Sequence, residues 1–317
     1  MDQPKGEQPV STHELNSPEE VKTAFAAHKY LLPDHAATVL FLAGKLEKPV
    51  LVEGPAGVGK TDLSRVLARA LGRRLIRLQC YEGLDEGKAL YEWQYGKQLL
   101  YSQILKDKIS EEMARDVSLS MAVERISSFD DVFFSERFVQ PRPLLQAIRS
   151  RDPIVLLVDE VDKSDPEFEA FLLEVLSDFT VSIPEIGTIA ASSIPRVILT
   201  SNNSREMSDA LKRRCLHLFL DFPSPETELE IVLLKVPDLR ETVARQVVNV
   251  VDKLRRMSLK KSPSISETLD WAAALVSLSV DTLSDDVLDH TLSVLLKYER
   301  DLARARERMP ELKQGFN

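Results

Sequence analysis

The chain has 317 residues, of which 29% are charged and 44% apolar, and its formal net charge is −9. This composition predicts a globular protein of one large or two modest domains, and the acidic balance argues against a nucleic-acid partner, since such proteins usually present a broad basic surface. The sequence has no apolar run long enough to span a membrane, no secretory signal and no CxxC pair, so we expect a cytoplasmic protein without structural zinc or disulfides.

The first 222 residues predict an α/β domain behind a short arm. Residues 1–16 are polar, contain prolines and lack periodicity, so we expect a flexible arm. Nearly continuous apolar runs then alternate with helical patterns, which is typical of parallel strands covered by helices on both faces. These runs are PVLVE (49–53), LIRLQC (75–80), IVLLV (154–158), RVILT (196–200) and LHLFL (216–220). We therefore expect an α/β domain over residues 17–222 with a five-stranded parallel sheet.

Two insertions interrupt this alternation of strands and helices. The stretch 81–153 is too long for one crossover helix and contains two helical patterns, so we expect surface elements that carry partner contacts. Residues 179–195 alternate in polarity and contain Pro184 and Gly187, which indicates a hairpin.

Residues 223–317 predict a small all-helical domain, joined to the first through a hinge around Pro223 and Pro225. Apolar residues recur at helical spacing over 239–257. Ser264 and Glu267 have the spacing of a capping box ahead of another helix, and Ser284 is placed to cap a third.

A phosphate-binding loop follows the first predicted strand. The pattern GxxxxGK[ST] is met in full by Gly54, Pro55, Ala56, Gly57, Val58, Gly59, Lys60 and Thr61, with a strand before it and a helix after it. Glycines let backbone N–H groups close around phosphate oxygens, and the helix N-terminus adds partial positive charge. Lys60 would reach the β and γ phosphates and Thr61 would bind Mg²⁺. The alternative, a glycine-rich turn without function, does not explain the flanking strand and helix.

Acidic and amide side chains follow two further strands. Asp159 ends a buried strand, where a carboxylate can hold magnesium through water, and Glu160 is placed to deprotonate an attacking water. Asn202 follows the next strand and could bind the γ-phosphate or the attacking water. A solvated strand end for the acids, and an ordinary turn for the amide, remain the alternatives.

A basic cluster, Lys212 to Arg214, lies between a helical piece and the last strand. Such clusters are usually solvated. An arginine at this place could also stabilise transferred phosphoryl charge in the active site of a neighbouring subunit.

Together, GPAGVGKT, VDE, TSNN and LKRR, followed by a helical lid, resemble an AAA+ ATPase over residues ~20–300. Two segments are similar to the MoxR branch of this family: LVDEVDKSDPEFEAFLLEVLSD and ALKRRCLHLFLDFPSPE. Two others resemble the CoxD-like subgroup of that branch, which takes part in the maturation of carbon monoxide dehydrogenase: LQCYEGLDEGKALYEW and KSPSISETLDWAAAL.

This resemblance implies a role for each matching residue. Lys60, Thr61 and Asp159 would hold ATP and Mg²⁺, with Asp62 beside them in the nucleotide site. Glu160 would be the catalytic base and Asn202 the residue that orients water. Arg214, or else Arg213, would be the arginine finger that acts in trans. Tyr30 to Leu32 would form part of the adenine pocket. The lid stretch Ser264–Glu267 lacks the arginine that many AAA+ lids offer to the nucleotide.

The resemblance also implies that the chain assembles with copies of itself into a ring, expected to be a hexamer. It further implies two partners: a protein with a von Willebrand A domain, and a client metalloenzyme such as a molybdenum-containing carbon monoxide dehydrogenase. Peripheral membrane association stays open. The alternatives from other classes are an ATP-binding switch or scaffold with little hydrolysis, and a nucleic-acid-associated AAA+ motor.

Overall fold

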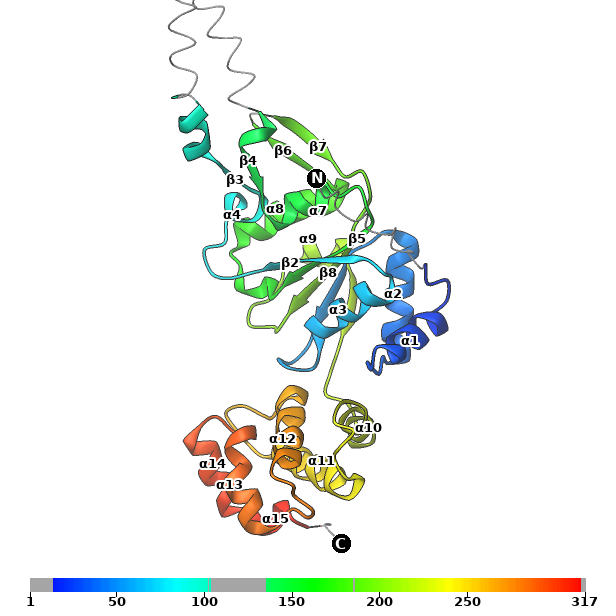
Figure 1. Ribbon diagram of the computed structural model, residues 1–317, viewed down its shortest axis with the longest axis vertical. Coiled ribbons are helices and arrows are strands. Elements are labelled where there is room, and N and C mark those ends of the chain that lie inside the picture. The colour runs from blue at the N-terminus through cyan, green and yellow to red at the C-terminus, as the bar shows by residue number, and fades with distance from the viewer. Residues whose placement is uncertain (1–13, 102, 104–134, 185, 315–317) are drawn as a thin grey trace, which may run out of the picture.

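The computed structural model describes residues 14–101, 103, 135–184 and 186–314 (Figure 1). Its centre is a five-stranded sheet in the order β2-β5-β8-β1-β9, with every neighbouring pair parallel. The strands are β1 (Val50–Glu53), β2 (Arg74–Gln79), β5 (Ile154–Asp159), β8 (Arg196–Ser201) and β9 (Leu216–Phe219). The predicted α/β fold with a five-stranded parallel sheet is therefore confirmed.

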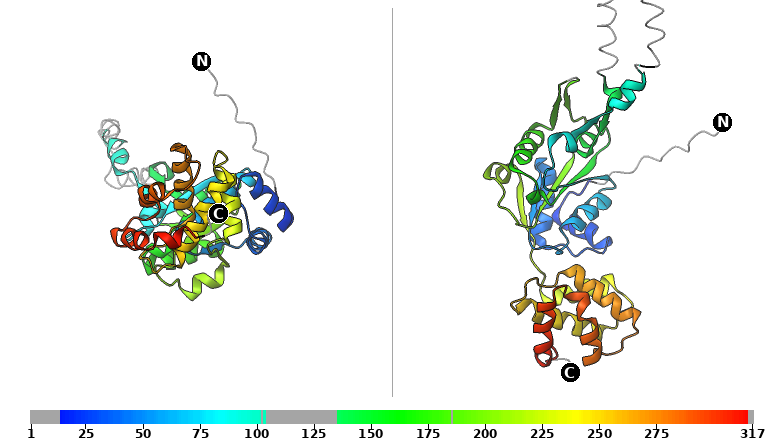
Figure 2. Two further views of the ribbon diagram at one scale, coloured as in Figure 1. Left: turned by 90° about the horizontal axis from the view of Figure 1, so that it is seen from below. Right: turned by 90° about the vertical axis from the view of Figure 1, so that its left-hand side faces the viewer.

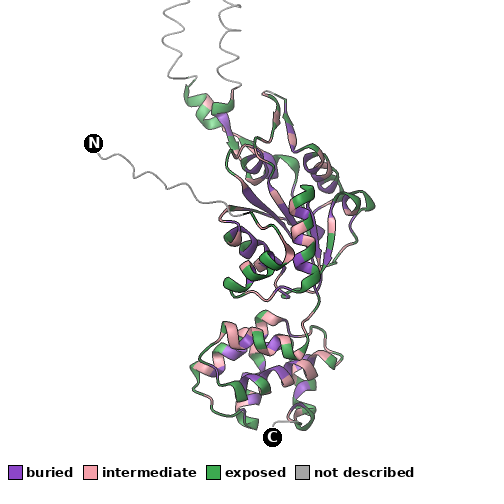
Figure 3. Cartoon of the chain, turned by 90° about the vertical axis from the view of Figure 1, so that its right-hand side faces the viewer, coloured by how far each residue is buried: buried purple, intermediate pink, exposed green. Residues whose placement is uncertain are grey.

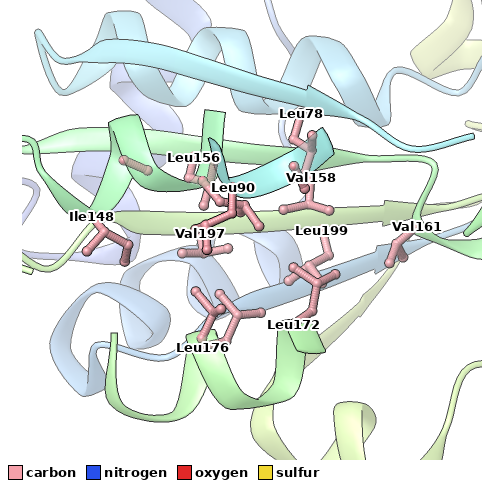
Figure 4. Close-up of a cluster of buried hydrophobic side chains, with 14 of the residues drawn as sticks. Leu78, Leu90, Ile148, Leu156, Val158, Val161, Leu172, Leu176, Val197 and Leu199 are labelled. Carbon is pink, nitrogen blue, oxygen red and sulfur yellow. The ribbon is translucent and has the colours of Figure 1, made fainter. Parts of the chain in front are cut away.

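Helices cover both faces of this sheet because its central strands are apolar on both sides. In β5, Leu156 and Val158 belong to one buried cluster, whereas Val155 and Leu157 belong to a second on the opposite face. Figure 4 shows part of the first cluster, to which helices on that face contribute. The covering helices are α7 (Pro143–Ile148) and α8 (Pro166–Asp178) on that face, and α1 (Pro18–Ala27), α2 (Asp34–Leu46) and α3 (Lys60–Ala70) on the other.

The two insertions form small sheets apart from the central one (Figure 1). Residues 179–195 contain the predicted hairpin, β6 (Thr180–Ile183) with β7 (Gly187–Ala190). The described part of 81–153 contains α4 (Glu86–Leu90), β3 (Tyr91–Trp93), η1 (Glu136–Phe138) and β4 (Val139–Pro141) besides α7. The helical patterns predicted there fall partly on 104–134, which lie outside the described residues.

The chain after β9 is entirely helical where the structure describes it, and it forms a separate bundle with its own core (Figure 2). Its largest fully buried side chain is Trp271, whose indole N–H donates to Thr291 Oγ1 at 2.8 Å. Ser264 and Glu267 form the predicted capping box, and Ser284 caps its helix. The helices are α10 (Pro225–Lys235), α11 (Glu241–Arg256), α12 (Ile265–Ser277), α13 (Asp285–Leu295), α14 (Glu299–Glu307) and α15 (Met309–Leu312).

In both parts of the molecule the buried residues lie on the helix faces that meet other elements, and the exposed residues lie outside (Figure 3). Within the described residues, no helix is long and apolar enough to cross a membrane. The predicted arm, 1–16, falls almost wholly on residues 1–13, outside the described residues.

Candidate functional site

The predicted phosphate-binding loop joins the carboxyl end of β1 to the first turn of α3. Two of its glycines lie so close to other parts of the chain that a side chain would not fit. A Cβ on Gly54 would lie 1.9 Å from the carbonyl oxygen of Leu220, and a Cβ on Gly57 would lie 2.3 Å from Cβ of Ser264. Both glycines have positive φ. The first backbone N–H groups of α3 have no partner within the helix and so offer donors to an anion at the loop.

Lys60 begins α3, and its ammonium group folds back onto the loop. Nζ donates to the carbonyl oxygens of Gly54 and Pro55, at 2.7 Å each, and the residue is only 6% exposed. Burial lowers the pKa of Lys60, while the negative charges of nearby carboxylates, Asp162 first, act in the opposite direction. The lysine is therefore held inside the loop, next to the position that a phosphate would occupy.

Asp159 ends β5 and is surrounded by donors. Oδ1 accepts from the Thr61 hydroxyl at 3.0 Å and from the Thr200 hydroxyl at 2.6 Å. Oδ2 accepts from Nε of Arg77 at 2.9 Å and from its terminal nitrogen at 2.5 Å. The hydroxyl of Thr61 and the carboxylate of Asp159, predicted as cation-binding residues, thus lie in direct contact. Hard oxygen donors of this kind fit Mg²⁺.

Glu160 follows Asp159 with a left-handed backbone, φ 56° and ψ 49°. A non-glycine residue costs about 1–2 kcal/mol in this conformation, which is therefore maintained by its surroundings. Its carboxylate accepts from Asn202 Nδ2 at 3.1 Å, from Gln79 Nε2 at 2.8 Å and from Lys163 Nζ at 2.7 Å. The predicted base and the predicted water-orienting amide are therefore hydrogen-bonded to each other.

Asp162 fixes the loop that follows β8. Its Oδ2 accepts from the backbone N–H of Ser204 at 3.0 Å and from the Ser204 hydroxyl at 2.5 Å. Burial alone would raise the pKa of Asp162, but hydrogen bonds outweigh it and lower that pKa, first those from the hydroxyl and backbone N–H of Ser204 and then one from the backbone of Asn202. Asp162 thereby anchors the loop that carries Asn202.

A cavity of about 460 Å³ lies beside the loop, between the sheet domain and the helical bundle. Tyr30 and Leu31 line it, whereas Leu32 is buried in the core. Asp62 also lines it and approaches Lys235 of α10 to 3.5 Å. The other lining residues come from the loop, the hinge and the bundle, among them Gly57, Val58, Gly59, Phe222, Pro223, Ile231, Ile265, Ser266 and Leu269.

Arg213 and Arg214 are not brought into this network. Both are exposed at the end of α9 (Asp209–Arg214), and neither side chain forms a hydrogen bond or ion pair with residues in the described ranges. They remain available at the surface, as a residue that acts on another subunit would need to be.

Four polar residues of the network were not predicted as site residues: Arg77, Gln79, Lys163 and Thr200. For the first two, the sequence shows only that residues 77 and 79 share one face of a strand. That Gln79 pairs in register with Asp159 is visible only in the structure. Asp165 is the N-cap residue of α8, but its side chain does not cap the helix and instead accepts from the N–H of Gly83 at 3.2 Å.

Thr200→Val is expected to lower the free energy of unfolding by about 1–3 kcal/mol. Valine keeps the shape of the threonine side chain but has no hydroxyl group. The variant therefore loses the hydrogen bond that this hydroxyl donates to Asp159 and the one that it accepts from the backbone N–H of Glu160 at 2.9 Å. Urea denaturation measures the difference. Thr188→Val, on the exposed strand β7, is the control and should stay within about 0.5 kcal/mol. An equally small effect at Thr200 would show that these bonds add nothing to stability.

Comparison with known proteins gives the following relatives. Residues 49–215 match the sequence profile of the family described as "AAA domain (dynein-related subfamily)". The chain is 27% identical over 263 residues to "Gas vesicle ATPase GvpN" of Haloferax mediterranei, covering 77% of this chain and 70% of that protein. It is 31% identical over 156 residues to "Chaperone protein ClpB 2" of Thermosynechococcus vestitus, covering 49% of this chain and 14% of that protein. The RuvB Holliday junction branch migration motor of Thermotoga maritima aligns with a TM-score of 0.45 and 18% identity, over 93% of this chain and 76% of that one.

Proposed function

Because the chain belongs to the AAA domain family of the dynein-related subfamily, we propose that it is a MoxR-type ATPase that uses ATP hydrolysis to remodel a client protein. The observation that carries this proposal is the network in which Lys60, Thr61, Asp159, Glu160 and Asn202 meet at one edge of the sheet. These residues come from the ends of two neighbouring parallel strands, β5 and β8, and from the start of α3, at the edge where α/β sheets bind ligands.

Each residue of the network has a task in hydrolysis. Lys60 and the loop amides bind the β and γ phosphates. Thr61 and Asp159 would hold Mg²⁺, which neutralises phosphate charge when it is bound. Glu160 accepts the proton of the attacking water, and Asn202, which already contacts Glu160, orients that water. A site with both the base and its amide partner is built for hydrolysis, which disfavours the alternative of a switch that only binds ATP.

The helical bundle from residue 223 acts as a lid in this proposal, and residues 17–222 as the nucleotide-binding domain. The lid lacks the arginine of many AAA+ lids, but Ser264 approaches the loop so closely that a Cβ on Gly57 would collide with it. Ile265, Ser266 and Leu269 line the cavity beside the loop. We infer that this lid senses nucleotide by packing on the loop rather than through a guanidinium.

We propose that the chain assembles into a ring, since a trans role of Arg213 or Arg214 needs a neighbouring subunit, and six subunits is the number that the resemblance to AAA+ ATPases implies. The client is proposed as a metalloenzyme undergoing maturation, with a von Willebrand A domain protein as adaptor, in the cytoplasm. The relative named as a gas vesicle ATPase suggests a different kind of client, one that belongs to gas vesicles. A pull-down of the Glu160→Gln variant from the native host, with mass spectrometry, separates these clients from each other and from a nucleic-acid motor.

Lys60→Ala is expected to weaken binding of MgATP at least about 100-fold, because the charge-assisted hydrogen bonds to the β and γ phosphates are lost. Isothermal titration calorimetry measures the affinity. Arg69→Ala, an exposed position on the same helix, is the control and should bind as the wild type does. Unchanged affinity in Lys60→Ala would exclude this loop as the nucleotide site.

A further inference from the structure

Arg77 contacts the carboxylate that would face the magnesium ion. It projects from β2 beside β5, and two of its nitrogens donate to Oδ2 of Asp159, at 2.9 and 2.5 Å. The same guanidinium donates to Oε1 of Gln79, whose amide nitrogen donates in turn to Glu160 at 2.8 Å. Arg77 therefore adds a positive charge to the cation-binding edge of the site.

This ion pair joins a buried acid to a half-exposed base. The side chain of Asp159 is 2% exposed, whereas that of Arg77 is 43% exposed. Removal of Arg77 would still leave Asp159 with the hydroxyls of Thr61 and Thr200 as donors. The carboxylate of Asp159 thus keeps hydrogen-bond donors without the guanidinium of Arg77. What the guanidinium adds is a positive charge that partly neutralises this carboxylate, the group that would attract a divalent cation.

We propose that Arg77 competes with the divalent cation for Asp159 and so limits how strongly Mg²⁺ promotes nucleotide binding. The proposal rests on the function proposed above. Its physical basis is that a positive charge in contact with a carboxylate weakens the attraction of that carboxylate for a second cation. The weakening is moderate at this site because the side chain of Arg77 is partly solvated. Arg77 is in this sense a positioning residue that sets the cation requirement of the site.

The test compares nucleotide affinity with and without the cation. A non-hydrolysable ATP analogue with an imido bridge between the β and γ phosphates is titrated into the full chain by calorimetry, once in EDTA and once in excess Mg²⁺. The ratio of the two dissociation constants measures the contribution of the cation. In Arg77→Gln this ratio should exceed that of the wild type about five- to tenfold. Arg77→Lys keeps the charge and should stay near the wild-type ratio.

Arg74→Gln is the matched control, since Arg74 is an exposed arginine on the same strand whose side chain forms no hydrogen bond or ion pair among the described residues. Its ratio should equal that of the wild type, and thermal unfolding establishes that each variant is folded. An unchanged or smaller ratio in folded Arg77→Gln overturns the inference. Failure of the wild type itself to bind the analogue would instead overturn the proposed function.

Discussion

Glu160→Gln is expected to bind ATP as the wild type does and to hydrolyse it about 10²- to 10⁴-fold more slowly. Glutamine has the size of glutamate and keeps one oxygen acceptor, but it cannot take a proton from water. The backbone at this position is left-handed, and since neither side chain is branched at Cβ, the fold should not change. Release of phosphate from MgATP measures turnover, and calorimetry measures ATP binding.

The control for this variant is Glu167→Gln, which removes the same charge from an exposed position on α8. Its turnover should match that of the wild type. ATP trapped between subunits should also favour assembly of the Glu160→Gln ring, since a ligand that bridges subunits adds its binding free energy to their association. Turnover close to the wild-type value in Glu160→Gln would place the base on another residue.

Arg214→Ala is expected to retain ATP binding and lose about 10³-fold or more of its turnover, the usual contribution of an arginine finger. Binding should persist because Lys60, Thr61 and the loop amides are untouched. Arg214 is exposed and lies outside the network of its own subunit, so a finger role for it would have to be exerted across a subunit interface. Turnover per subunit should therefore rise with protein concentration and reach a plateau once assembly is complete.

Mixed rings distinguish a finger from a folding defect. Glu160→Gln lacks the base but donates an intact finger, while Arg214→Ala lacks the finger but keeps the base. When the two are assembled together, some interfaces combine an intact base with an intact finger, so part of the activity should return. If native mass spectrometry detects mixed rings but turnover stays at the level of the parents, Arg214 has no trans role, and Arg213→Ala should be tested in the same way.

The sequence alone determined the fold class and the phosphate-binding loop. Both rest on local signals, because apolar runs such as 154–158 must be buried on two faces and the loop pattern is contiguous from Gly54 to Thr61. The carboxylates of Asp159 and Glu160 could be placed at a strand end for the same reason. Helix starts at Ser264 and Ser284 were also predictable, since a cap depends on residues within one turn.

Only the tertiary structure decided which side chains meet. The order β2-β5-β8-β1-β9 brings Arg77 and Gln79 beside Asp159 and Glu160, although about 80 positions separate them along the chain. No local pattern states that order, because any apolar strand can pair with any other. The approach of Ser264 to Gly57 likewise depends on how the helical bundle packs against the loop. Residue types and spacing fixed the chemistry that was available, whereas strand order and packing fixed the partners of each reactive group.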